Sequence, residues 1–196
     1  MKKRLALLLT FAVVLVGVAG CDNPSGPAAD NMNVLAAHGD IQLRARLQGL
    51  NEVPPTNSRA TGELRAAISA DETSISFTLS FSGLTGNPAA AHIHFGPSKV
   101  NGGVMVFFCG GGGKPACPSA TAGTATGTIT AAGIVGPAAQ GILPAPAGQF
   151  ADVVRAIRTG NAYANIHTAT FPGGEIRGRV FVVGFDRNGG DDDNDD

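Results

Sequence analysis

The sequence predicts an all-β protein, an antiparallel sandwich of two sheets of Greek-key type with one short crossover helix. Three observations lead to this prediction. Apolar and polar residues alternate in about eight short segments, as they do on strands with one buried face. Turn-forming stretches such as LTGNP, SKVNGG and FPGG separate the segments. A single segment has helical spacing, and a closed barrel is the alternative arrangement of the same strands.

Strict alternation predicts the individual strands. In TSISFTLSF, the residues Ile75, Phe77 and Leu79 take one parity and the serine and threonine residues take the other. Strands are predicted by the same rule over 41–47, 63–69, 73–81, 90–95, 103–109, 122–131, 162–169 and 175–183. The last two flank FPGG, so we expect them to form a hairpin.

The predicted helix lies in GQFADVVRAIRTG. Its apolar residues Phe150, Val153, Val154 and Ile157 recur at helical spacing, and Gly160 stands where a helix C-terminus is expected.

The N-terminus has the features of an export signal. Residues 1–20 begin with three basic residues and continue with a short apolar run and small residues. The run ends in VAGC, which resembles the lipobox of bacterial lipoproteins and implies that Cys21 carries lipid. An ordinary secretory cleavage site is the alternative. We therefore expect a protein of the bacterial cell envelope, anchored in the membrane by its lipid and facing the periplasm or the exterior.

Composition divides the rest of the chain. Residues 21–37 are small, polar and proline-containing, which predicts a flexible tether. The segment 186–196 carries five aspartates in its last six positions and predicts a disordered acidic tail. The folded domain is then expected over 38–185. Without the three basic residues of the signal, the chain has 11 basic and 15 acidic residues and no clustered lysines or arginines, so a nucleic-acid partner is not expected.

Two cysteines remain once Cys21 is assigned to lipid. Cys109 and Cys117 flank the glycine-rich stretch GGGGKPA, and in an exported protein they predict a disulfide bond. A metal-binding pair is the alternative, but the spacing is longer than that of structural zinc sites. A phosphate-binding loop is excluded because Pro115 follows Lys114 where a serine or threonine is needed.

Four separated blocks of the sequence resemble one family. They are LQGLNEVPPTNSRATGELRA at 47–66, TSISFTLSFSGL at 73–84, AAHIHFGPSKVNGGVMV at 90–106 and NAYANIHTATFPGGEIRGRV at 161–180. Together they resemble the CHRD domain, named for chordin and also found in exported bacterial proteins. In chordin these domains belong to a secreted antagonist of bone morphogenetic proteins, a partner that the bacterial members lack. HIHFG is also locally similar to a paired-histidine segment of copper–zinc superoxide dismutases.

Three histidines are the candidate metal ligands. On a strand, His92 and His94 share one face while Ala91 and Ile93 take the other, which predicts that the apolar pair faces the core and the imidazoles face the more accessible side. By the same parity His167 opposes Ile166 on its own strand. We expect the three imidazoles to lie together, where they would suit copper or zinc.

The polar face of the same strands offers partners for these histidines. Asn165 shares the parity of His167, and in the predicted hairpin Glu175 or Arg177 lies opposite His167. Arg177 is also a candidate ion-pair partner of Glu175. EVPP is expected to form a corner, in which Glu52 accepts backbone N–H bonds. The alternative to a metal site is that the histidines only form structural hydrogen bonds.

The sequence favours a binding or adhesion module of the envelope, with a partner protein or other envelope ligand. A copper- or zinc-binding envelope protein is the alternative function. No nucleophile elbow or catalytic triad order is present in the sequence, so we do not expect an enzyme.

Overall fold

The computed structural model describes residues 39–185. The predicted signal, Cys21, the tether and the acidic tail lie outside this range. The described elements are β1 (Ile41–Gln48), η1 (Gly49–Asn51), β2 (Thr61–Ile68), β3 (Ser74–Ser82), β4 (Pro88–Phe95), β5 (Gly103–Cys109), β6 (Gly123–Thr130), η2 (Ala131–Gly133), η3 (Ala138–Gln140), α2 (Phe150–Arg158), β7 (Ala162–Thr168), β8 (Ile176–Arg179) and β9 (Phe181–Phe185). The prediction of an antiparallel all-β protein with one α-helix is confirmed for this part of the chain.

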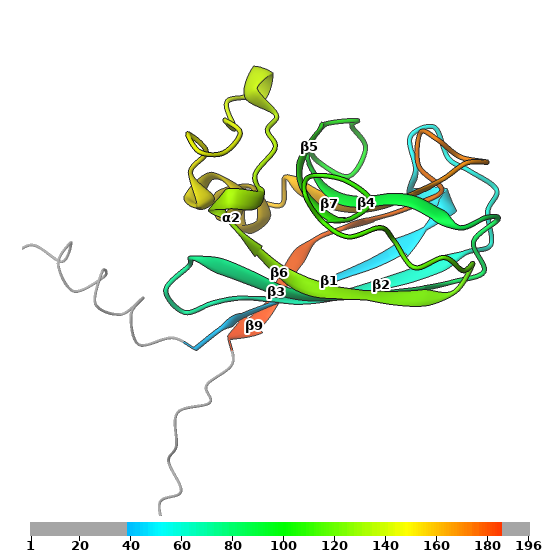
Figure 1. Cartoon of the computed structure of the whole chain (residues 1–196), viewed down its shortest axis with the longest axis horizontal. Coiled ribbons are helices and arrows are strands. Elements are labelled where there is room, and N and C mark those ends of the chain that lie inside the picture. The colour runs from blue at the N-terminus through cyan, green and yellow to red at the C-terminus, as the bar shows by residue number, and fades with distance from the viewer. Residues whose placement is uncertain (1–38, 186–196) are drawn as a thin grey trace, which may run out of the picture.

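The strands form one continuous sheet, whereas the sequence predicted two. The order is β5-β4-β7-β8-β1-β2-β3-β6, with β9 also paired to β1. The sheet bends over on itself, so that β1, β2, β3 and β6 form one layer and β4, β5 and β7 form the other (Figure 1). Val106 of the edge strand β5 forms an isolated bridge with Ile134, which follows the other edge strand, β6, by four residues. The result is a nearly closed, barrel-like sheet.

The last predicted strand is interrupted at Val180, and the chain passes there from one layer to the other. The predicted strand 175–183 is divided into β8, which pairs with β7, and β9, which pairs with β1. Between them the Val180 N–H donates to the Ala162 carbonyl, 2.9 Å away, and the Val180 side chain is fully buried. β1 is thereby hydrogen-bonded to β8 at Gln48 and to β9 along its first half, which joins the layers without an interruption.

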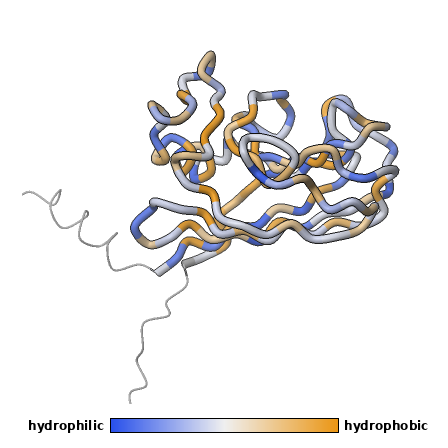
Figure 2. The backbone as a smooth tube through the Cα atoms, viewed as in Figure 1, coloured by the Kyte–Doolittle hydropathy of each residue, from blue (hydrophilic) through white to orange (hydrophobic). Residues whose placement is uncertain are grey.

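The core fills the space between the layers. Hydrophobic and hydrophilic residues alternate along the strands (Figure 2), and the apolar parity faces inward. Ala91 and Ile93 are buried as predicted from the alternation in β4. The largest buried aliphatic side chains are Leu43, Leu47, Leu64, Ile68, Ile75, Leu79, Ile93, Met105, Ile129 and Ile157. Within residues 39–185, no helix has the length and apolar character needed to cross a membrane.

The helix covers one end of this core. α2 buries Phe150, Val153, Val154 and Ile157, the four residues whose spacing predicted it. Gly160 follows the helix in the left-handed region at φ 73°, which allows the chain to turn directly into β7.

Cys109 and Cys117 form a disulfide bond in the structure. The loop that it closes lies against Phe107 of β5. A Cβ atom on Gly111 or Gly112 would come within 2.4 Å or 2.7 Å of the Phe107 ring, so the glycines permit this close approach. The loop therefore covers one face of Phe107, a side chain that also contacts the candidate site.

Candidate metal centre

The pairing of β4 with β7 brings the three histidines together. His92 lies opposite Asn165, His94 opposite Tyr163, and Ala90 opposite His167. The three imidazoles occupy the face opposite to Ala91 and Ile93. One nitrogen from each histidine can be chosen so that all three nitrogens lie within 4.8 Å of one another. Two motifs far apart in the sequence thus form one cluster.

This face is largely covered, contrary to the sequence-based expectation, although His94 and His167 remain partly exposed. His92 is only 6% exposed, and its ring meets the edge of the Phe107 ring at a centroid distance of 4.9 Å. Tyr163 stacks on His94 with centroids 4.6 Å apart and planes 6° apart. Alternation assigned the correct face, but it could not show that side chains and loops cover that face.

Backbone carbonyls fix the tautomers of two histidines. His94 Nδ1 lies 2.8 Å from the Gly102 oxygen, and His167 Nδ1 lies 2.9 Å from the Pro172 oxygen. A carbonyl only accepts, so each Nδ1 carries the hydrogen and each Nε2 is left with a lone pair. His92 Nδ1 lies 2.8 Å from His94 Nε2 and donates to it. His167 Nε2 is buried, and no partner for it exists within the described residues.

Burial keeps the cluster neutral. It lowers the pKa of His92 to about 3, with a further lowering by the charges of its two neighbouring histidines. Burial also lowers the pKa of His94 to about 4, although its bond to Gly102 opposes the shift. The pKa of His167 is lowered for the same first reason. All three imidazoles are therefore uncharged at neutral pH, and the neutral imidazole is the form that binds a metal.

The spacing suits a transition metal after a small adjustment. Tetrahedral Zn–N bonds of about 2.0–2.1 Å place ligand nitrogens roughly 3.3 Å apart. In the structure, the His92–His94 contact is shorter than this and the widest separation in the cluster is longer. An ion bound by His94 Nε2 would replace the hydrogen bond from His92 Nδ1, so the two rings must move apart when the metal binds. The carbonyl bonds on Nδ1 of His94 and His167 are the type of support that orients metal-binding imidazoles.

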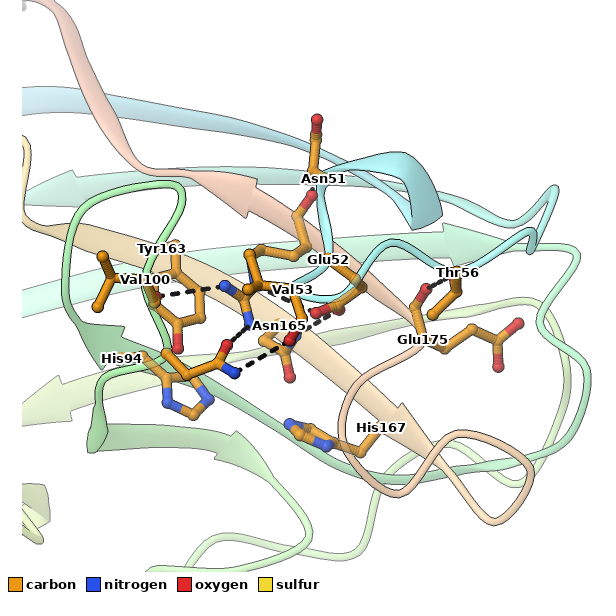
Figure 3. Close-up of polar contacts among 12 residues, drawn as sticks. Asn51, Glu52, Val53, Thr56, His94, Val100, Tyr163, Asn165, His167 and Glu175 are labelled. Carbon is orange, nitrogen blue, oxygen red and sulfur yellow. Dashed lines mark hydrogen bonds and ion pairs between the residues drawn. The ribbon is translucent and has the colours of Figure 1, made fainter.

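A buried polar network stands behind the histidines (Figure 3). Asn165 Nδ2 donates to Glu52 Oε1 at 2.6 Å, and Arg177 Nε lies 3.1 Å from Glu52 Oε2 in an ion pair. Glu52 and Arg177 are each 3% exposed. Burial raises the pKa of Glu52 to about 7, although Arg177 and Asn165 both act to lower it. This role of Glu52 was not predicted from the sequence, where its one signal was an isolated carboxylate inside the EVPP segment.

Arg177 also holds the loop 97–102 over the cluster through hydrogen bonds. Its guanidinium carbon lies 4.1 Å from the centre of the Tyr163 ring, and its Nη2 donates to Asn101 Oδ1 at 2.6 Å. Asn101 in turn donates to the Val53 carbonyl, 3.0 Å away. The Gly102 N–H donates to the Tyr163 hydroxyl at 3.1 Å. Residues 97–102 are therefore tied to the EVPP segment and to the histidine cluster at the same time.

Glu175 does not belong to this network, and it is not the ion-pair partner of Arg177. It precedes β8, and its buried carboxylate accepts hydrogen bonds from the hydroxyls of Ser58, Thr85 and Thr168 and from the Thr85 N–H, at 2.7–3.0 Å. Burial raises the pKa of Glu175, but these bonds outweigh it and hold the pKa below its usual value. Across the β7–β8 pair, Asn165 lies opposite Arg177 and Tyr163 opposite Arg179. Glu175 and Arg177 have the same parity along the strand, so alternation alone could not show which of them joins the network around Asn165.

Comparisons with known proteins identify the family. The sequence model of the CHRD domain matches residues 43–180, more than half of the chain. The matched range contains the three histidines and the network of Glu52, Asn165 and Arg177. Comparisons with curated proteins and with solved structures give no match. The chain belongs to the CHRD domain family.

Proposed function

We propose that the chain is an exported, lipid-anchored protein of the bacterial cell envelope whose CHRD domain binds one copper or zinc ion through His92, His94 and His167. One observation carries the metal site: three neutral imidazoles converge, and the buried Nε2 of His167 has no partner in the part of the chain described by the structure. The signal-like residues 1–20 and the VAGC sequence at Cys21 support export and anchoring.

The alternative in which the histidines are only structural leaves this nitrogen unexplained. Buried polar atoms are nearly always hydrogen-bonded, and an unsatisfied acceptor costs about 1–3 kcal/mol. A metal ion bound to His167 Nε2 removes that cost. Imidazole nitrogens suit both copper and zinc, so the cluster alone does not select one of them.

A groove beside the cluster supports a second function, that of an envelope binding or adhesion module without catalytic activity. The groove has a volume of about 400 Å³, and both apolar and cationic residues line it. Leu50, at its rim, is 72% exposed. Its lining includes Leu50, Val53, Pro55, Lys99, Arg177 and Arg179. The partner would be a protein or another envelope ligand with an anionic and an apolar part.

Metal analysis of the untagged soluble protein, purified without chelator, tests the metal function. We expect one copper or zinc ion per chain, and we expect its loss in the His92→Ala, His94→Ala double variant. His38→Ala is the matched control, because it removes the histidine to which the sequence assigns no role. Circular dichroism checks that each variant is folded. A folded wild-type protein that binds neither ion in equilibrium titrations would leave the groove as the remaining functional site.

A further inference from the structure

Asn165 is held in one orientation by its surroundings. It is 1% exposed, and its Nδ2 donates to the Glu52 carboxylate, which fixes the amide nitrogen on that side. Gly174 closes the space around this nitrogen, since a Cβ atom at Gly174 would stand 2.6 Å from Asn165 Nδ2. The amide oxygen, Oδ1, therefore points away from Glu52.

This oxygen is a second buried acceptor without a partner. Asn165 Oδ1 is buried and, like His167 Nε2, has no hydrogen-bond partner among residues 39–185. Asn165 lies opposite His92 across the β4–β7 pair and two residues before His167, on the same face of the sheet as both. Figure 3 shows Asn165 between His94 and His167. The two unpartnered acceptors thus come from one face of β7, two residues apart.

The two atoms require different partners. An imidazole nitrogen is a good ligand for copper or zinc, whereas an amide carbonyl oxygen suits magnesium, calcium or manganese. Three imidazoles select the first group, so Asn165 Oδ1 is a poor fourth ligand for the same ion. As an acceptor it needs a group that donates a hydrogen. Zinc ions held by three protein ligands keep a fourth position for water or substrate, and a bound water supplies such a hydrogen.

We infer that the ion in this site keeps a fourth, exchangeable position, which holds a small ligand that donates a hydrogen bond to Asn165 Oδ1. Water is the resting ligand, and other small molecules with a hydrogen on the coordinating atom belong to the same class. Bare anions such as azide have no hydrogen to donate and are disfavoured relative to water. Asn165 is a positioning residue. This inference rests on the proposed metal site and adds what the metal binds.

The experiment uses the soluble chain with Cys21→Ser, loaded with one equivalent of Cu²⁺ and with its metal content measured first. Pulsed electron paramagnetic resonance in deuterated water then detects exchangeable deuterons on a copper-bound ligand. Azide is titrated through its charge-transfer absorption in this protein and in the same protein carrying Asn165→Leu. We expect bound water in the parent protein, and about tenfold tighter azide binding in Asn165→Leu, because water has lost its hydrogen bond. Asn87→Leu, at an exposed asparagine, is the matched control and should leave azide binding unchanged.

The outcomes separate the two proposals. Stoichiometric copper without an exchangeable water ligand would overturn the open position and leave the metal site standing. Equal azide affinity with and without Asn165 would overturn the role of Asn165. A protein that takes up no copper would overturn both proposals. Should Asn165→Leu fail to fold, the deuteron measurement on the parent protein still decides whether the fourth position is open.

Discussion

At the scale of single residues, the charges that matter for this domain are the buried ones. Glu52 and Arg177 form their ion pair inside the protein, while Glu63 bonds to Arg44 and Arg65 on the outer face of the sheet at 3.1 Å in each case. A surface pair is screened by water and contributes little to stability. Breaking a buried pair leaves an uncompensated charge, which is far more costly.

Arg177→Met should therefore destabilise the protein strongly. The substitution keeps much of the side-chain volume but leaves the Glu52 carboxylate without its cation, at a cost of about 3–5 kcal/mol in the free energy of unfolding. Urea denaturation measures this loss. Glu63→Gln is the matched control at an exposed pair, and its unfolding midpoint should stay close to that of the wild type. Similar midpoints for both variants would show that the Glu52–Arg177 pair is not a significant source of stability.

The stability of the metal-free protein should fall on acidification. The pKa values of His92 and His94 are about 3 and 4 in the folded protein and about 6.5 in the unfolded chain. Between pH 6.5 and 4, His92 and His94 therefore bind protons in the unfolded chain but not in the folded protein. Each such proton lowers the free energy of unfolding by roughly 1.4 kcal/mol per pH unit.

Glu52 acts in the opposite direction. Its pKa is raised from 4.5 to about 7 on folding, so its contribution is fully present below pH 4.5 and is lost as the pH rises through 7. The histidines outnumber this single carboxyl, and the net stability should still fall between pH 6.5 and 4.5. Denaturant melts across this range measure the slope, which Glu52→Gln should make steeper. A stability that is constant or rises on acidification would contradict the assignment of buried neutral histidines.

Residue parity in the sequence was enough to place the histidines but not their surroundings. The β-strand period of two put His92, His94 and His167 opposite their aliphatic neighbours, and the pairing of β4 with β7 then placed them together. Their burial depends on Phe107 and on the loop 97–102, whose positions have no local signal in the sequence. The contacts of Glu52 with Asn165 and Arg177 are also tertiary, so they have no local signal in the sequence either.

At the scale of elements, the turn between β7 and β8 is a tightly constrained connection near the site. Gly174 has φ 124°, a conformation that side chains disfavour, and a Cβ atom there would also lie 2.7 Å from Glu52 Oε1. The adjacent Gly173 has no atom within 4 Å of such a Cβ. Of the two neighbouring glycines in FPGG, Gly174 has no room for a side chain, whereas Gly173 does.

Gly174→Ala should destabilise the domain, and Gly173→Ala should not. Alanine at position 174 combines backbone strain of about 1–3 kcal/mol with displacement of Asn165 or Glu52. Thermal unfolding measures the stability, and a metal titration measures the site, which should weaken in Gly174→Ala alone. Equal unfolding temperatures for the two variants would show that the turn adapts without cost.

The disulfide loop should contribute to stability without being essential for folding. The chain-entropy model gives a bridge that closes so short a loop about 2–3 kcal/mol. Cys109→Ser, Cys117→Ser should lose this amount in denaturant melts, and the wild type under a reducing agent is the control that should match it. Free thiols on both cysteines of the exported, unreduced protein would contradict the bridge.

The elements themselves followed local rules, while their assembly did not. Alternation predicted β3 and the spacing of Phe150, Val153 and Ile157 predicted α2, because each pattern reports one buried face. The inward faces of a sandwich and of a barrel alternate in the same way, so the pattern could not decide between two sheets and one. That decision depends on the backbone bonds around Val180, where the chain passes from β8 to β9.

At the scale of the whole molecule, both ends of the described chain lie at one end of the sheet. Ile41 at the start of β1 pairs with Phe185 at the end of β9. β1 then runs to Gln48 and leads to Glu52, which at about 3.3 Å per residue places the candidate site more than 20 Å from those ends. Figure 1 shows the loop after β1 and the turn between β7 and β8 together at the opposite end of the molecule. An anchor preceding β1 would therefore be attached at the end of the domain opposite to the candidate site.

The last prediction concerns that anchor. Because a lipid on Cys21 would be the attachment to the membrane, Cys21→Ser should move the protein from the membrane fraction to the soluble fraction without changing its metal content. Fractionation followed by mass spectrometry of the N-terminal peptide measures both the location and the acyl mass. The Cys109→Ser, Cys117→Ser variant is the matched control: it loses two cysteines and should remain with the membrane, because its attachment does not involve the folded domain. A wild-type protein that is already soluble and carries no acyl mass would show that VAGC is an ordinary cleavage site. The metal site would then belong to a protein that is not attached to the membrane.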